Sequence, residues 1–200
     1  NVVKEASDKN INILLLDMAV YEVCATKNPE YSFKKAFQHL RKHSDIVNIS
    51  YSTGKLMAKE LKNGEIKTDF IDIELSSGKD VINELIKNKR KSKVIVSYHN
   101  FKETPKEPKE LNGIYEKIKK LNPSIIKIAT FANSINDNLT IFELIKRAKQ
   151  ERREIIALCM GEKGEISRIL SPLFGSYLTF ASLKEGKESA QGQISADKLK

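Results

Sequence analysis

Lys127 has the most chemically informative setting in this 200-residue chain. It lies in the apolar run Ile125–Ala129, where a charged group without a partner is costly to bury. Desolvation favours the neutral amine, and a neutral amine can attack a carbonyl carbon. Alternatively, the lysine stem is buried while its ammonium reaches water at the strand end. The sequence leaves both interpretations open.

His99 and Arg168 also follow apolar runs. His99 ends the run Val94–Tyr98, and an imidazole can exchange a proton near neutral pH. A histidine at a strand end can equally be a packing residue held by hydrogen bonds. Arg168 follows the run Glu154–Gly161 in a glycine-containing loop. There a guanidinium would suit the carboxylate or phosphate of a small ligand, and a surface salt bridge is the alternative.

The polar segment Ser189–Gln193 follows the last apolar run. Loops after the final strands of a β/α barrel commonly bind anionic groups. The chain has no GxGxxG and no Walker-type loop, which argues against the nucleotide-binding open sheets. It also lacks CxxC spacing, and we expect no metal. Cys24 and Cys159 lie in apolar runs and are predicted to be buried free thiols in a reducing compartment.

Seven apolar runs predict the strands that position these side chains. Most are continuous rather than alternating, which is typical of strands buried on both faces of a parallel sheet. Amphipathic helices separate them, with apolar stripes at Ile141, Leu144, Ile145 and Ala148 in one case. The pattern predicts repeated β/α units. The predicted strands are Val20–Thr26, Asp45–Tyr51, Phe70–Leu75, Lys93–His99, Ile125–Thr130, Glu154–Gly161 and Tyr177–Leu183.

Three other segments qualify this pattern. Thr104–Glu107 predicts a helix start, with a threonine cap, a proline in the first turn and a glutamate three residues after the cap. Ile11–Leu16 is a further strand candidate, serving either as a capping hairpin or as a barrel strand. The segment between Tyr51 and Phe70 contains one helical stretch, Lys55–Leu61, and no clear strand.

Composition limits the function classes. The net charge of +9 comes from 29 Lys and only 6 Arg, whereas nucleic-acid binders usually rely on Arg. The dense basic run Lys87–Lys93 is predicted to be a solvated loop, so we expect no nucleic-acid partner. No apolar run approaches the roughly 18 residues of a membrane span. The length suits one domain, residues 1–200, and is short of the about 250 residues usual for an eight-unit barrel. The first residue is Asn, which suggests a processed protein or part of a longer one.

Several of these motifs, in this order, resemble the type I 3-dehydroquinate dehydratase family. The similarity runs from about residue 69 to the end of the chain. Its motifs are similar to those of plant-like members, in which the dehydratase is fused to a shikimate dehydrogenase. The matching stretches are Phe70–Leu75, Ser97–Phe101 with Thr104 and Pro105, Ile126–Ala129, Met160–Gly161 with Gly164, Ile166–Arg168, Phe174–Ser176, Thr179–Phe180 and Ser189–Gln193.

This resemblance implies an α/β fold, a (β/α)8 TIM barrel that is irregular around its third strand. It implies a lyase that dehydrates 3-dehydroquinate to 3-dehydroshikimate in the shikimate pathway of aromatic amino acid biosynthesis. Lys127 would form a Schiff base with the substrate ketone, and His99 would act as general acid and base. The implied substrate-binding residues are Arg168, Ser189 and Gln193, with Met160 and Phe180 lining the pocket.

The resemblance implies no metal and no organic cofactor. The implied partner is the small-molecule substrate, with a homodimer or a fused shikimate dehydrogenase domain as further expectations. The implied location is the cytoplasm, or the plastid for a plant-like protein. Asn48 and Ser50 stand where the family has Glu and Arg, and Gln191 stands where it has Pro. The alternative is therefore a catalytically degenerate barrel that serves as a scaffold in a larger polypeptide.

Overall fold

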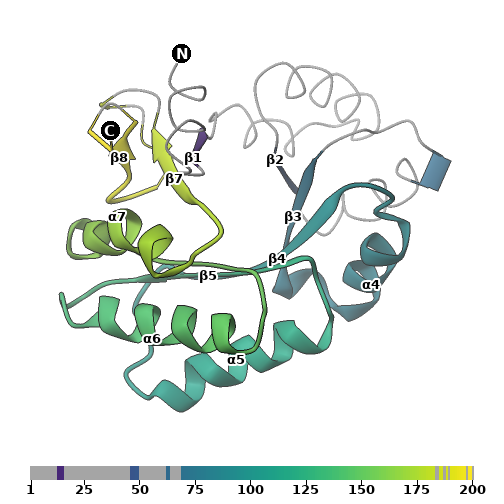
Figure 1. Ribbon diagram of the computed structural model, residues 1–200, viewed down its shortest axis with the longest axis horizontal. Helices are drawn as coiled ribbons and strands as arrows, with labels where there is room; N and C mark the ends of the chain where they lie inside the picture. The colour runs from purple at the N-terminus through teal and green to yellow at the C-terminus, as the bar shows by residue number, and fades with distance from the viewer. Residues whose placement is uncertain are drawn as a thin grey trace. The chain divides into compact units, whose positions relative to one another are not determined.

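The computed structural model describes residues 13–15, 46–49, 62–63, 69–182, 185–186, 188, 190–196 and 198–199 (Figure 1). The chain divides into two compact units. The first unit contains Asn1–Leu16, His99–Glu116 and Ile126–Lys200, and the second contains Asp17–Tyr98 and Lys117–Ile125. Several predicted features lie outside the described residues: the strand Val20–Thr26, the helical stretch Lys55–Leu61, Cys24, Ser50 and Ser189.

Parallel strands form the core of the second unit. Strand β2 (Ile46–Ile49) pairs in parallel with β3 (Phe70–Glu74), which pairs in parallel with β4 (Lys93–Asn100). The continuous apolar runs of β3 and β4 agree with their buried central residues, as expected for strands covered on both faces. The predicted strands at these three places are confirmed to within two residues at each end. The fully buried side chains of this core include Ile71, Ile73, Val94, Ile95 and Val96.

The connection between β3 and β4 turns through a short 3-10 helix, η3 (Leu75–Ser77), and helix α4 (Lys79–Asn88). Helix α4 buries Val81, Ile82 and Leu85, which lie on one face at helical spacing. The basic run after α4 forms a turn, as predicted, and is only partly solvated. Lys89 donates to the Ser124 hydroxyl at 3.0 Å, and Arg90 donates to the Lys62 carbonyl at 2.9 Å.

The first unit contains a second set of β/α elements. Strand β5 (Ile125–Phe131) pairs in parallel with β6 (Ile155–Met160). Helix α6 (Asp137–Gln150) connects the two strands, and η4 (Glu162–Gly164) with α7 (Glu165–Phe174) follows β6. Helices α6 and α7 pack against β6 and against each other (Figure 1). The predicted apolar stripe of α6 is confirmed, since all four of its residues are buried.

Strand β1 (Ile13–Leu15) decides between the two interpretations of the N-terminal run. It pairs in parallel with β7 (Thr179–Ser182), which pairs in parallel with β8 (Ile194–Ser195). Parallel pairing with a late strand is the behaviour of a barrel strand, whereas a capping hairpin would be antiparallel. The short strand β8 was not predicted, because two residues carry no periodic signal. The described strands all run in parallel ladders and do not form a closed barrel.

Helix α5 (Pro108–Lys120) begins three residues later than predicted. Thr104 is not its cap, because its hydroxyl is engaged elsewhere. The Thr104 side chain is buried, and its Oγ1 lies 2.7 Å from Thr130 Oγ1 and donates to the Phe131 carbonyl at 3.0 Å. Pro108 takes the first helical position, where the absence of an N–H is harmless. The segment between β4 and α5 is therefore fastened to the end of β5.

Cys159 lies beside this pair of threonines. Its Sγ is 3.6 Å from both Thr104 Oγ1 and Thr130 Oγ1. The prediction of a buried free thiol is confirmed. Burial raises the pKa of the Cys159 thiol, and its hydrogen bonds with Thr104 and Thr130 only partly oppose this. Cys159 is thus a neutral packing residue at physiological pH.

Polar contacts also hold the outer helices. Arg147 of α6 donates to the Glu151 carboxylate at 3.0 Å, to Asn112 of α5 at 2.6 Å and to the Glu116 carboxylate. Tyr115 lies under the guanidinium, with 4.8 Å between Arg147 Cζ and the ring centroid, and donates to Glu151 at 2.9 Å. Burial and then the Glu151 carboxylate raise the pKa of the Tyr115 phenol. No helix in the described ranges is long and apolar enough to span a membrane.

Ser167 connects β6 to α7. Its hydroxyl donates to the Gly164 carbonyl and accepts from the Cys159 N–H, both at 2.7 Å. Removing the hydroxyl by Ser167→Ala leaves both groups buried without this partner. We expect the free energy of unfolding to fall by about 1–3 kcal/mol in urea titrations. The exposed Ser76→Ala control should change it by less than about 0.5 kcal/mol. Equal stability of the two variants would contradict this account.

The raised pKa of Cys159 also has a measurable consequence. Because the thiolate is the reactive form, iodoacetamide at pH 8 should leave Cys159 unmodified in the folded protein. In urea the same cysteine should be alkylated within minutes, and peptide mass mapping identifies the site. Alkylation of Cys159 in the native protein at the rate measured in urea would show that it is neither buried nor neutral.

Candidate active site

Lys127 occupies the third position of β5, whose first six residues are all buried. It pairs in register with Ile156 of β6, and its side chain is only 5% exposed. The Nζ atom lies 4.8 Å from the ring centroid of Phe180 in β7. This aromatic face offsets part of the desolvation of the ammonium. The low exposure of Lys127 favours the interpretation in which its amine is buried over the one in which the amine reaches water.

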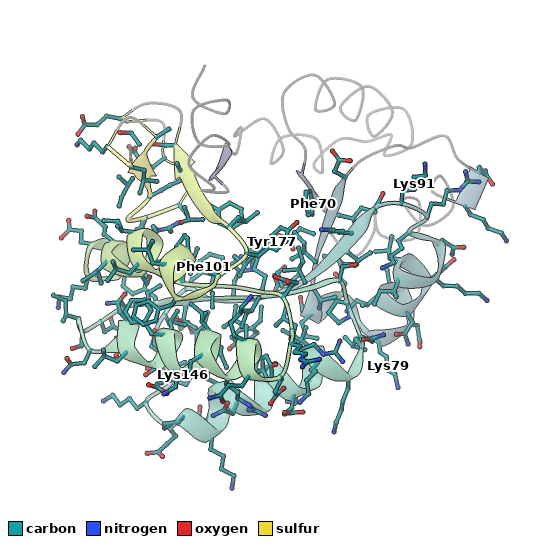
Figure 2. All side chains as sticks on the ribbon, viewed as in Figure 1. Phe70, Lys79, Lys91, Phe101, Lys146 and Tyr177 are labelled. Carbon is teal, nitrogen blue, oxygen red and sulfur yellow. The ribbon has the colours of Figure 1, made fainter. Side chains whose placement is uncertain are left out.

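His99 is the seventh residue of β4, at the carboxyl end of the strand as predicted. Its ring is half-buried and stacks on Phe101, with centroids 5.7 Å apart and planes inclined by 9°. The side chain of Phe101 is 68% exposed and is labelled in Figure 2. Asn100 orders the following turn, because its Oδ1 accepts from the N–H groups of Lys102 and Glu103. The imidazole is thus held at the point where the strand becomes loop.

Arg168 lies in helix α7, not in the loop that the sequence suggested. The glycines before it belong to the turn at η4, which leads directly into the helix. The side chain is 2% exposed, so a surface salt bridge is excluded. Burial lowers the pKa of Arg168 to about 10, which leaves the guanidinium charged at neutral pH.

The hydrogen bonds of Arg168 are incomplete. Its Nη2 donates to the Gln191 carbonyl at 3.3 Å, and its own backbone carbonyl accepts from Thr179 Oγ1 at 2.7 Å. Its buried Nε has no hydrogen-bond partner among the described residues. A buried guanidinium that keeps an unused donor is suited to a bound carboxylate or phosphate.

Three other predicted site residues are buried in the same unit. Met160 ends β6 in register with Phe131, and Phe180 lies in β7 under the Lys127 amine. Gln193 directly precedes β8 and is 6% exposed, with its N–H donating to the Ala190 carbonyl. Ser189 lies outside the described residues. The structure thus joins Lys127 to Phe180, and joins Arg168 to the segment that carries Gln193.

A pocket of about 800 Å³ opens in the first unit beyond the carboxyl ends of β5 and β6. Its walls include Phe131, Asn133, Lys163 and Gln191, while the predicted catalytic residues do not line it. Gln191 lines this pocket, and its backbone carbonyl accepts from the buried Arg168. Within the described residues, no group of three or more His, Cys, Asp or Glu side chains could hold a metal ion.

Sequence reasoning gave no separate role to Phe101, Gly161 or Gly192. Phe101 is part of a family-like motif, and the structure shows its ring stacked on His99 beside the turn at Asn100. Gly161 and Gly192 both have positive φ, 81° and 70°, and approach each other closely. Isolated glycines in polar segments gave no signal that these two meet.

Comparison with known proteins assigns this architecture to a family. Residues 33–200 match the family model of type I 3-dehydroquinase. The 3-dehydroquinate dehydratase of Methanococcus maripaludis is 45% identical over 150 residues, which cover 73% of this chain and 64% of that protein. This chain spans about half to two thirds of the length of the curated relatives that it matches.

Solved structures agree. The type I 3-dehydroquinate dehydratase of Clostridium difficile, solved with covalent modified comenic acid, has a TM-score of 0.71 and 30% identity over 84% of this chain and 72% of that one. A dehydroquinate dehydratase and shikimate dehydrogenase from S. pombe shares the fold, with a TM-score of 0.69 and 21% identity over 99% of this chain and 41% of that one. The family fold is the TIM barrel predicted from the sequence. With 168 of its residues, 33–200, matched by the family model, this chain belongs to the type I 3-dehydroquinase family.

Proposed function

We propose that this chain dehydrates 3-dehydroquinate to 3-dehydroshikimate and water through a Schiff base on Lys127. The observation that carries the proposal is a lysine 5% exposed in an otherwise apolar strand, with its amine against an aromatic ring. Family membership and the name shared by the relatives support the same reaction. The structure solved with covalent modified comenic acid shows that a relative can carry a covalently modified ligand.

Lys127 begins the proposed reaction by attacking the substrate ketone. His99 in its protonated form would give a proton to the hydroxyl of the resulting carbinolamine, so that one water leaves and a protonated imine remains. This imine withdraws electrons from the neighbouring carbon, and His99 is left neutral. A proton on that carbon then becomes acidic enough for a side-chain base to remove.

His99 is the proposed base and acid. Its imidazole would remove the acidified proton and then protonate the departing hydroxyl, so that a second water leaves as the conjugated double bond forms. Hydrolysis of the imine consumes one water, so that the net products are 3-dehydroshikimate and one water. Stacking on Phe101 limits the rotation of the imidazole and keeps it at the strand end during both transfers.

Arg168 is proposed to hold the substrate carboxylate, with Gln193 and Ser189 binding the carboxylate and hydroxyls. The unused Nε of Arg168 supports this role. Met160 and Phe180 would supply apolar surface beside the reacting carbons. Asn48, which stands where the family has Glu, lies on β2 in register with Asp72. The proposed site therefore relies on Arg168 to balance the negative charge of the substrate carboxylate.

Borohydride trapping tests the Schiff base directly. Incubation with 3-dehydroquinate and sodium borohydride should add one reduced ligand, located by mass mapping to the peptide containing Lys127. Lys127→Ala should form no adduct and lose turnover, because no other lysine in the described part of the chain is buried in this way. Lys146→Ala is the matched control, since Lys146 is exposed on α6 (Figure 2) and should leave both unchanged. A folded wild-type protein that forms no adduct would support the scaffold alternative.

Replacing His99 by Ala should separate proton transfer from imine formation. We expect kcat to fall by about 10²- to 10⁴-fold in an assay of the conjugated enone product. The borohydride adduct on Lys127 should still accumulate over longer incubation, because the amine nucleophile is intact. Retention of wild-type kcat by His99→Ala would remove His99 from the mechanism.

A further inference from the structure

Gly192 lies against the backbone of Gly161. A Cβ atom added to Gly192 would lie 2.2 Å from the Gly161 carbonyl oxygen and 2.6 Å from its carbonyl carbon. These distances are far below van der Waals contact, and the obstacle is backbone rather than a flexible side chain. The φ of Gly192 is +70°, which also favours glycine. The segment before β8 therefore reaches the end of β6 only because residue 192 lacks a side chain.

Gly161 cannot easily move away from this contact. Its carbonyl accepts a hydrogen bond of 2.9 Å from the Gly164 N–H, which closes the turn at η4. On its other side lies the ring of Phe131, and a Cβ at Gly161 would be 2.8 Å from Phe131 Cζ. Gly161 is thus held between the Phe131 ring and the Gly192 backbone.

The carbonyl of Gln191 completes the arrangement. It accepts from the Gly161 N–H at 3.0 Å and from Arg168 Nη2 at 3.3 Å. Two donors from different elements, the turn after β6 and helix α7, therefore converge on one backbone acceptor. The N–H of Gln193 donates to the Ala190 carbonyl at 3.1 Å and closes a turn around Gln191. The close approach of Gly192 to Gly161 is what brings this carbonyl within reach.

We propose that the contact between Gly161 and Gly192 holds the segment Ala190–Gln193 in its position and thereby sets the affinity for substrate. The inference rests on the proposed function, because Arg168 and Gln193 are the proposed substrate-binding residues. Both glycines are positioning residues, since they act through the Arg168 guanidinium and through the position of Gln193. Lys127 and His99 lie outside this segment, on β5 and β4, and we expect loss of the contact to leave them in place.

The proposal predicts a separation of kinetic constants. If Ala190–Gln193 is no longer held in position, Arg168 and Gln193 should bind the substrate less tightly, while Lys127 and His99 should stay in place. KM should therefore rise by about tenfold or more, and kcat should stay within about threefold of wild type. A merely structural role for these glycines would instead lower the amount of folded enzyme and leave KM unchanged.

Gly192→Ala tests the proposal, with Gly186→Ala as its matched control. Gly186 lies in the preceding turn, has a φ of +77° and has no atom within 4 Å of an added Cβ. Both variants therefore carry the strain of positive φ, and only Gly192→Ala meets the Gly161 carbonyl. We expect the raised KM in Gly192→Ala alone.

Amide hydrogen exchange provides a readout that needs no substrate. The Gly161 N–H is bonded to Gln191 O, so NMR should find it protected in wild type and in Gly186→Ala. In Gly192→Ala its exchange should be at least about tenfold faster, while the amides of β5 and β6 keep their protection. Unchanged Gly161 exchange, an unchanged KM, or loss of protection throughout β5 and β6 would each overturn the proposal. If wild type forms no borohydride adduct, the proposed function fails. Hydrogen exchange of the Gly161 amide still decides whether the contact holds the segment Ala190–Gln193 in position.

Discussion

The burial of one amine in an apolar strand is the constraint on which the rest of the site depends. A lysine in the middle of β5 gains no solvation from water and has an aromatic ring as its neighbour. Such a residue is costly to the free energy of folding, and buried ionisable groups of this kind are common at functional sites. The surrounding strands must be rigid enough to keep water out, which explains why β5 and β6 are buried along nearly their whole length.

Buried polar side chains near this core bond to backbone carbonyls. Thr104, which follows β4, donates to the Phe131 carbonyl at the end of β5. In helix α7, Ser167 donates to the Gly164 carbonyl of the preceding turn, and Arg168 donates to the Gln191 carbonyl of the segment before β8. These hydrogen bonds therefore connect loops and turns to neighbouring elements of the fold.

Local pattern was enough to predict the strands and the helix stripes. Continuous apolar runs located β3 to β7 because burial on both faces dictates residue type along each strand. The buried lysine, the strand-end histidine and the order of motifs also stand in the sequence itself. Contacts between distant segments do not. Thr104 has the local signature of a helix cap, but its hydroxyl bonds to a strand 26 residues away. Arg168 was assigned to a loop because glycines precede it, although they belong to a turn that starts a helix.

At Gln191 the backbone carbonyl makes the hydrogen bonds that matter, whereas the identity of the side chain does not affect them. The acceptor for Gly161 and Arg168 is a main-chain carbonyl, a group that every amino acid carries, proline included. The side chain of Gln191 is exposed. Glutamine in place of the proline expected from the family motif therefore preserves the acceptor. The next position has no such freedom, because any substituent on its α-carbon would occupy space already taken by a neighbouring peptide. In this turn, residue 191 can therefore be replaced without loss of the acceptor, whereas residue 192 must remain glycine.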